Sequence, residues 1–153
     1  MSFDTPNGTR GRRLPSGPLF RWLNNQASRR LRRKGGTMMG FNALVLTTVG
    51  RKSGLERTNP VGWFPGADGS WLIVASAAGA ARNPAWYYNM AAHPDRVQVE
   101  IDGRTVAVIP EQLHGTERDQ AWRQITAAAP RFADYQGKTD REMPVIRLVP
   151  RSG

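Results

Sequence analysis

The 153 residues predict a single α+β domain in which most strands pair antiparallel in a sheet or a barrel. Short segments rich in β-branched residues alternate with turns that contain glycine or proline, and most of these connections have hairpin length. Segments with helical spacing are few and lie between the strands. A chain of this length can bury one sizeable core.

Six segments have the composition and length of strands. The first, residues 41–49, is almost continuously apolar, which predicts burial on both of its faces. Pro60 places the second strand at a sheet edge or a bulge, and the turn at residues 66–69 predicts a hairpin between the second and third strands. Asp102 and Gly103 form a tight-turn signal between the fourth and the fifth. The predicted strands are 41–49, 57–64, 70–75, 96–101, 104–109 and 144–149.

Helices are predicted at four places from apolar spacing and from start and stop signals. Asn83 is a favourable N-cap, and Pro84 suits the first helical position after it. Thr116 and Asp119 resemble a capping box. The predicted helices are 18–34, 84–93, 116–129 and, as a short helix or turn, 132–136.

The formal net charge of +10 is unevenly distributed. Residues 1–36 hold nine Lys/Arg and one Asp, whereas the rest of the chain holds thirteen Lys/Arg and eleven Asp/Glu. We therefore divide the chain into a basic N-terminal arm and helix, 1–36, and a folded domain, 37–153. Residues 1–16 are rich in Gly, Pro, Ser, Thr and Arg, which predicts disorder. An arm of this charge suits an anionic partner.

Phe20 and Trp22 within that arm favour an anionic membrane surface as the partner of residues 12–34. Nucleic acid is not predicted, because no reader motif follows in the domain. No segment approaches the roughly 20 apolar residues that span a bilayer, and no secretory signal is visible. The expected location is the cytoplasm, with peripheral contact at the inner face of the plasma membrane.

The composition also limits the chemistry. The absence of cysteine excludes disulfides, thiolate nucleophiles and cysteine metal sites. The two histidines, His93 and His114, lie near element ends and have no clustered carboxylates, so no metal site is predicted and a surface position is favoured for both. If the protein is an enzyme, a cofactor must supply the reactive group.

Two segments together have the features of a cofactor site. Residues 50–54, Gly-Arg-Lys-Ser-Gly, follow the first strand and offer backbone N–H groups, two cations and a hydroxyl to an anion. Residues 83–89, Asn-Pro-Ala-Trp-Tyr-Tyr-Asn, open a helix that could supply an aromatic wall. The alternatives are an ordinary exposed hairpin turn and a helix face that packs in the core.

Four motifs in this order resemble the deazaflavin-dependent nitroreductase family of actinobacteria, including mycobacteria. They are Leu-Thr-Thr-Val-Gly-Arg-Lys-Ser-Gly at 46–54, Arg-Thr-Asn-Pro at 57–60, Val-Ala-Ser at 74–76 and the segment 83–89; residues 134–145 match in part. The resemblance runs from about residue 41 to residue 149. It implies a split β-barrel with flanking helices, of about six mostly antiparallel strands, similar to flavin reductases and pyridoxamine-phosphate oxidases. It also implies coenzyme F420, an 8-hydroxy-5-deazaflavin with a phospholactyl-oligoglutamate tail.

Carried over by position, the resemblance implies roles for individual residues. The substrate pocket would be bordered by Phe132 and Tyr135, with packing as the alternative, and Tyr135 is the candidate catalytic residue. Ala77 departs from the lysine that relatives often carry there, which removes one cation from the tail site. The implied cofactor-binding residues are Arg51, Lys52, Ser53, Arg57, Asn59, Pro60, Ala75, Ser76, Ala77, Trp86 and Asn89.

The expected function is therefore that of an oxidoreductase. It would transfer a hydride from reduced coenzyme F420 to a small acceptor, which is a quinone, an enone or a nitro compound. The alternatives are a split-barrel protein that binds flavin mononucleotide or haem, and a non-catalytic F420 carrier or membrane-docking module. Monomer and homodimer both remain open.

Overall fold

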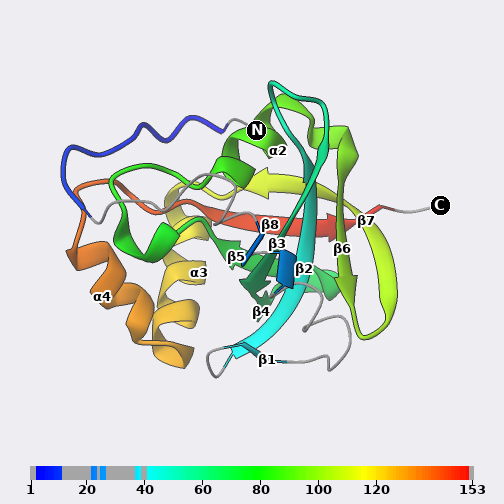
Figure 1. Ribbon diagram of the computed structural model, residues 1–153. Helices are drawn as coiled ribbons and strands as arrows, with labels where there is room; N and C mark the ends of the chain where they lie inside the picture. Colours follow the sequence, from blue (N-terminus) through cyan, green and yellow to red (C-terminus); the bar gives the residue numbers. More distant parts are fainter. Residues whose placement is uncertain (1–2, 12–21, 24, 27–36, 39–40, 152–153) are drawn as a thin grey trace.

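A computed structural model of the chain describes residues 3–11, 22–23, 25–26, 37–38 and 41–151. Within these residues, eight strands form one antiparallel sheet that curls into a barrel, with helices at its sides (Figure 1). The predicted α+β class with antiparallel strands is confirmed. The strands are β1 (Thr37–Met38), β2 (Phe41–Val49), β3 (Glu56–Gly62), β4 (Phe64–Pro65), β5 (Trp71–Val74), β6 (Val97–Ile101), β7 (Arg104–Gln112) and β8 (Val145–Pro150).

The second predicted strand is divided in the structure, and this division closes the barrel. The sheet order is β1-β2-β6-β7-β8-β5-β4. Strand β3 lies off this order and pairs with the edge of β2 opposite β6. Only Trp63 separates β3 from β4, so one extended run pairs first with β2 and then with β5. The predicted hairpin is therefore correct for β4 and β5 and wrong for β3. Sheet twist explains the difference, because a long strand in a barrel crosses from one neighbour to another.

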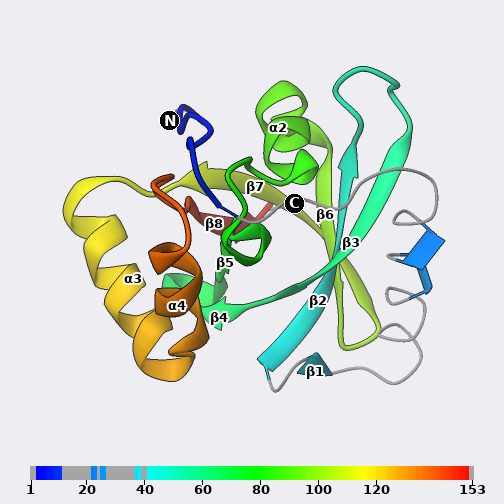
Figure 2. The ribbon, with the colours of Figure 1, turned by 60° about the vertical axis from the view of Figure 1, so that its left-hand side comes forward.

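The core lies inside the barrel and extends beneath two helices. In β6, Val97, Val99 and Ile101 are buried and alternate with half-buried residues, as the period of two predicts. They pack with Leu44 and Leu46 of β2 in the first hydrophobic cluster. A second cluster packs Phe64, Leu72 and Val74 against the helices α3 (Gly115–Ala128) and α4 (Arg131–Gly137). Figure 2 shows both helices side by side on one flank of the barrel.

Helix starts were predicted less well than helix positions. Helix α2 (Ala85–Ala92) begins after Pro84, which itself occupies the N-cap position; the N-cap prediction for Asn83 is wrong. Helix α3 begins at Gly115 with His114 at the N-cap, so Thr116 lies inside the first turn and cannot cap it. No side-chain cap bond is present at either helix, and the capping-box prediction is therefore also wrong.

The predicted helix 18–34 lies mostly outside the described residues. Four of its positions, 22–23 and 25–26, are helical in the structure. Trp22 and Leu23 expose 56% and 51% of their surface. No helix among the described residues has the length and the apolar character that a bilayer crossing requires.

Residues 3–11 form an N-terminal strap, the blue segment that runs along the upper left edge of the body in Figure 1. The Gly8 N–H donates to the Ala81 carbonyl at 2.7 Å. The backbone N–H and the hydroxyl of Thr9 both donate to the Asp140 carboxylate, and these bonds lower the pKa of Asp140 to about 2. The predicted disorder is wrong for these nine residues, because their polar groups find partners on the folded body.

Candidate functional site

The turn between β2 and β3 presents its cations to solvent. Gly50 donates to the Leu55 carbonyl at 2.8 Å and Gly54 donates to the Gly50 carbonyl at 2.9 Å, which closes the turn. Gly54 has a φ of +72°, which favours glycine. Arg51 and Lys52 are exposed and form no ion pair with any described residue. The turn therefore carries two charges that are available to an anion.

Asn89 of α2 connects this turn to the barrel. Its amide oxygen accepts a hydrogen bond from the Arg51 N–H at 3.1 Å, and its amide nitrogen donates to the Thr48 hydroxyl at 3.1 Å. Asn89 is 6% exposed and Thr48 is fully buried. The two segments singled out in the sequence, 50–54 and 83–89, are thus in direct contact in the folded protein.

Replacement of Asn89 by alanine is expected to lower the free energy of unfolding by about 1–3 kcal/mol, because a buried hydroxyl and an amide N–H would lose their partner. Denaturant unfolding measures the change. The matched control is Asn42→Ala in the same sheet, since Asn42 is exposed and its change should stay within about 0.5 kcal/mol. Equal effects of the two substitutions would contradict the structural role of the Asn89 side chain.

Tyr88 supports the side chain of Arg51. The guanidinium carbon lies 4.5 Å from the centroid of the Tyr88 ring, within the range of a cation–π contact. The Tyr88 hydroxyl donates to the Asn7 amide oxygen of the strap at 2.7 Å. Sequence reasoning treated Tyr88 only as part of the aromatic segment 83–89 and did not predict its contact with Arg51.

The residues of β3 divide between the two faces of the sheet. Arg57 lies opposite Thr48 and Asn59 lies opposite Leu46, so both are on the face that α2 covers. Pro60 pairs with Val45 and therefore lies on the other face. All three are half-buried. The structure thus brings Arg57 and Asn59, but not the ring of Pro60, to the Asn89 side of the sheet.

The segment that follows β5 lies at the same end of the barrel as the cationic turn. Four antiparallel steps separate β2 from β5, so the two strands run in the same direction and their C-terminal ends point to the same end of the barrel. Ala75 is buried, whereas Ser76 and Ala77 are half-buried. Ala77 has a φ of +47°, a strained value for a residue with a Cβ. The 3-10 turn η2 (Ala77–Gly79) continues from there.

Arg141 holds this segment from behind. Its guanidinium donates to the carbonyl oxygens of Ala75, Ser76 and Ala80 at 2.8–3.1 Å, and to the Asn83 amide oxygen at 2.7 Å. Only 2% of Arg141 is exposed, and this burial lowers the pKa of its guanidinium. In the sequence it appeared only as part of a C-terminal motif, because its acceptors lie 58–66 residues away.

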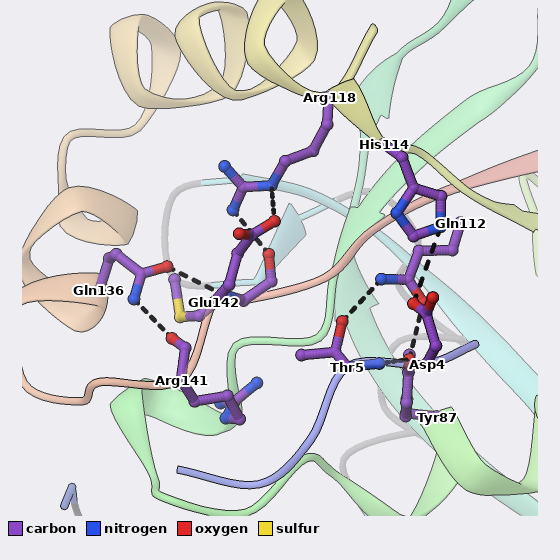
Figure 3. A network of polar contacts seen from close by, with 10 residues as sticks. Asp4, Thr5, Tyr87, Gln112, His114, Arg118, Gln136, Arg141 and Glu142 are labelled. Atoms are coloured by element: carbon purple, nitrogen blue, oxygen red, sulfur yellow. Dashed lines mark hydrogen bonds and ion pairs between the residues drawn. The ribbon is translucent and has the colours of Figure 1, made fainter. Parts of the chain in front are cut away.

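A polar network attaches the strap to α2 (Figure 3). The Tyr87 hydroxyl donates to the Gln112 amide oxygen at 2.7 Å and accepts from the Thr5 N–H at 3.1 Å. The Gln112 amide nitrogen donates to the Thr5 hydroxyl at 2.8 Å. Burial raises the pKa of Tyr87, and the bonds from Thr5 offset part of that rise. Nothing in the sequence pattern signalled this network.

The aromatic residues assigned to a wall lie in two separate clusters. Trp86 is 7% exposed and packs in the first cluster, inside the barrel, which is the packing alternative. Phe132 is 7% exposed and packs in the second cluster, edge-to-face with Phe64 and with Tyr135 at 5.8 and 5.7 Å. Tyr135 is half-buried, and the Lys138 ammonium lies 5.7 Å from its ring centroid. Of Trp86, Phe132 and Tyr135, only Tyr135 is half-buried and could meet a small molecule directly.

The arrangement suits a polyanionic, acceptor-rich ligand. One end of the barrel carries two exposed cations on a closed turn, the cation–π contact of Arg51, and a strained segment with a buried guanidinium behind it. Cations and oriented amides of this kind attract phosphate and carboxylate groups. No group of three or more His, Asp or Glu side chains that could hold a metal ion occurs in the described residues.

Comparisons with known proteins give a consistent result. The model of the F420H(2)-dependent quinone reductase family matches residues 19–150. An F420H(2)-dependent quinone reductase of Mycobacterium tuberculosis is 34% identical over 112 residues, which are 71% of this chain and 74% of that protein. A solved F420-H2 dependent reductase, FDR-A, is 34% identical with a TM-score of 0.62, over 69% of this chain and 92% of the other.

A more distant structure shows the fold alone. The haem storage protein HutZ of Vibrio cholerae is 15% identical, with a TM-score of 0.52 over 85% of this chain and 92% of the other. The predicted split β-barrel is confirmed by this likeness and by the strand order described above.

Proposed function

Since the chain belongs to the F420H(2)-dependent quinone reductase family, we propose that it transfers a hydride from reduced coenzyme F420 to a small quinone-like acceptor. The family match over residues 19–150 carries this proposal. When bound, reduced F420 supplies the hydride, and the quinone takes it up together with one proton to give the hydroquinone. The protein has to hold the two rings together, exclude water and provide the proton.

The residues present fit this cofactor. The exposed Arg51 and Lys52 suit its phosphate and oligoglutamate tail, and Ser53 adds a hydroxyl on the same turn. Arg57 and Asn59 lie on the adjoining face of β3. The backbone of residues 75–77 lies at the same end of the barrel. Asn89 accepts the Arg51 N–H and so holds the cationic turn in place. Pro60 and Trp86 would act through packing, because one lies on the opposite face and the other in the core.

Titration of the protein with oxidised F420, followed by its fluorescence, tests the proposal. We expect binding of F420 to be tighter than binding of flavin mononucleotide, since flavin mononucleotide lacks the oligoglutamate tail that two of the cations would meet. Tighter binding of flavin mononucleotide, or of haem, would reverse the assignment. Consumption of reduced F420 in the presence of a soluble quinone then distinguishes an enzyme from a carrier.

Tyr135 is proposed to donate the proton or a hydrogen bond to the acceptor oxygen, with Phe132 behind it. Replacement of Tyr135 by phenylalanine keeps the edge-to-face contact with Phe132 and removes the hydroxyl. We expect the turnover number with a quinone to fall by about a hundredfold, while the dissociation constant for F420 stays the same. Unchanged quinone turnover would exclude the hydroxyl from the reaction.

The N-terminal arm is proposed to dock on an anionic membrane surface. Its basic residues and the exposed Trp22 and Leu23 support this, since a quinone acceptor is often dissolved in lipid. Each arginine near such a surface contributes about 1 kcal/mol. A variant that carries Arg29→Ser, Arg30→Ser, Arg32→Ser and Arg33→Ser should therefore float with anionic vesicles far less than the wild-type protein does. Equal flotation of the two proteins with anionic vesicles would contradict membrane docking by the arm. So would wild-type protein that floats equally well with neutral and with anionic vesicles.

A further inference from the structure

The charge of Arg141 has no carboxylate partner among the described residues. Its four hydrogen-bond acceptors are three backbone carbonyls and the Asn83 amide, all of them neutral. Arginine stays protonated in proteins, so a full positive charge is buried at this position. Burial of a charge without a counter-charge is costly even when its hydrogen bonds are made.

Two other arginines of the domain, Arg147 and Arg118, contact carboxylates. Arg147 pairs with Glu111 and, at 3.1 Å, with Glu117. Arg118 lies 3.2 Å from the Glu142 carboxylate, a contact drawn beside Arg141 in Figure 3. Both are more exposed than Arg141 and would need a counter-ion less. Among the described arginines, the most buried one thus lacks the carboxylate contact that Arg118 and Arg147 have.

Peptide geometry determines what the segment in front of Arg141 offers. No peptide bond in the described chain is cis, and in a planar trans peptide the N–H points opposite to the C=O. The carbonyls of Ala75 and Ser76 point at the guanidinium. The N–H groups of Ser76 and Ala77 therefore point away from it, from residues that are only half-buried. Two successive donors therefore point away from Arg141, whose positive charge lies behind them.

We propose that Arg141 is a positioning residue for the cofactor: it turns the Ser76 and Ala77 N–H groups toward an anionic or carbonyl-rich edge of coenzyme F420 and adds its own unneutralised charge. This assignment rests on the proposed function. It gives a reason for the strained backbone of Ala77 and for the missing counter-ion, because the ligand supplies the negative charge. The same chemistry can come from the phosphate of the tail or from the carbonyl groups of the deazaflavin ring.

The sharpest test adds a negative charge without touching Arg141. Asn83→Asp places a carboxylate 2.7 Å from the guanidinium and keeps an acceptor there, whereas Asn83→Ala removes the same amide donor without adding charge. We expect Asn83→Asp to bind oxidised F420 at least about tenfold more weakly than Asn83→Ala. At the same time Asn83→Asp should be no less stable to denaturant than Asn83→Ala, because the new ion pair compensates the buried charge.

A second set of variants acts on Arg141 itself. Arg141→Lys keeps the charge but loses the fork that reaches three carbonyls, and Arg141→Met removes both; each should weaken F420 binding by about ten- to a hundredfold. Arg147→Met is the matched control and should leave F420 affinity unchanged. Binding of the deazaflavin riboside, which lacks the phosphate and tail, separates the two sources. If the riboside loses as much affinity as F420, the ring is the contact; if only F420 loses affinity, the phosphate is.

The outcomes separate this assignment from the proposed function. Wild-type protein that fails to bind F420 would overturn both. Wild-type protein that binds F420, together with Asn83→Asp and Arg141→Lys proteins that are folded and bind it equally well, would overturn the role of Arg141 alone. Should the Arg141 variants fail to fold, the comparison of Asn83→Asp with Asn83→Ala still decides the question.

Discussion

The double substitution Arg51→Ala/Lys52→Ala should weaken binding of coenzyme F420 by about a hundredfold or more. Each charge-assisted hydrogen bond to an anionic group contributes roughly 1.5–3 kcal/mol, and these two side chains form no ion pair with the described protein that would have to be broken first. Fluorescence titration at low and high salt measures the change. The wild-type affinity should fall steeply with salt, and that of the double variant should fall less.

The control for this prediction lies at the opposite end of the same sheet. Arg104 begins β7 next to the Asp102–Gly103 turn and is exposed like Arg51 and Lys52. Arg104→Ala changes the net charge but not the proposed contacts, so it should alter F420 affinity by less than about threefold. The comparison is the loss of F420 affinity for each charge removed. If this loss were the same for Arg104→Ala and for Arg51→Ala/Lys52→Ala, general electrostatic attraction and not a specific contact would explain the binding.

The second large effect is expected for the barrel core. Ile146 is the second residue of β8, is fully buried and belongs to the first hydrophobic cluster. It pairs with Ile73 of β5 on one side and with Gln112 of β7 on the other. Ile146→Ala should lower the free energy of unfolding by about 2–5 kcal/mol through lost apolar burial and the cavity left behind. That is a large part of the roughly 5–15 kcal/mol typical of a domain.

Ile109→Ala is the matched control, since it makes the same chemical change on the neighbouring strand β7. Ile109 is 45% exposed, so about 0.5–1 kcal/mol is expected from its smaller loss of burial. Urea unfolding with a shared m-value compares the two variants directly. A similar loss of stability in both variants would contradict this prediction. It would mean that neighbouring side chains fill the cavity left by Ile146→Ala, so that the first cluster is not closely packed.

Local sequence signals placed most elements of the fold correctly. The bounds of β2, residues 41–49, agree with the prediction, because a continuous apolar run needs no information from elsewhere in the chain. The Asp102–Gly103 turn is another local signal, and both residues have positive φ values as that turn requires. The division of the second predicted strand at Trp63 was missed. It arises because residues 56–62 pair with β2 whereas residues 64–65 pair with β5, and this pairing cannot be read from local sequence.

The candidate site was predicted in part for the same reason. Arg51, Lys52 and Asn89 were proposed as cofactor-binding residues from two short motifs, and a hydrogen bond joins the two motifs in the folded protein. The role of Tyr88 depends on a side chain 37 positions away in sequence, and that of Arg141 on a segment about 60 positions away. Phe132 was assigned to the border of the substrate pocket, with packing as the alternative, and it packs from α4 into the second cluster.

The sequence by itself determined the strand-rich class, the cationic turn and the family to which the chain belongs, because composition, spacing and ordered motifs are properties of neighbouring residues. The tertiary structure alone decided that the N-terminal strap lies against α2 and that one long strand closes the barrel. It also decided that a buried arginine with no carboxylate partner among the described residues stands behind Ala75–Ala77. Those features arise from hydrogen bonds and burial between distant parts of the chain, and such contacts leave no periodic pattern in the sequence.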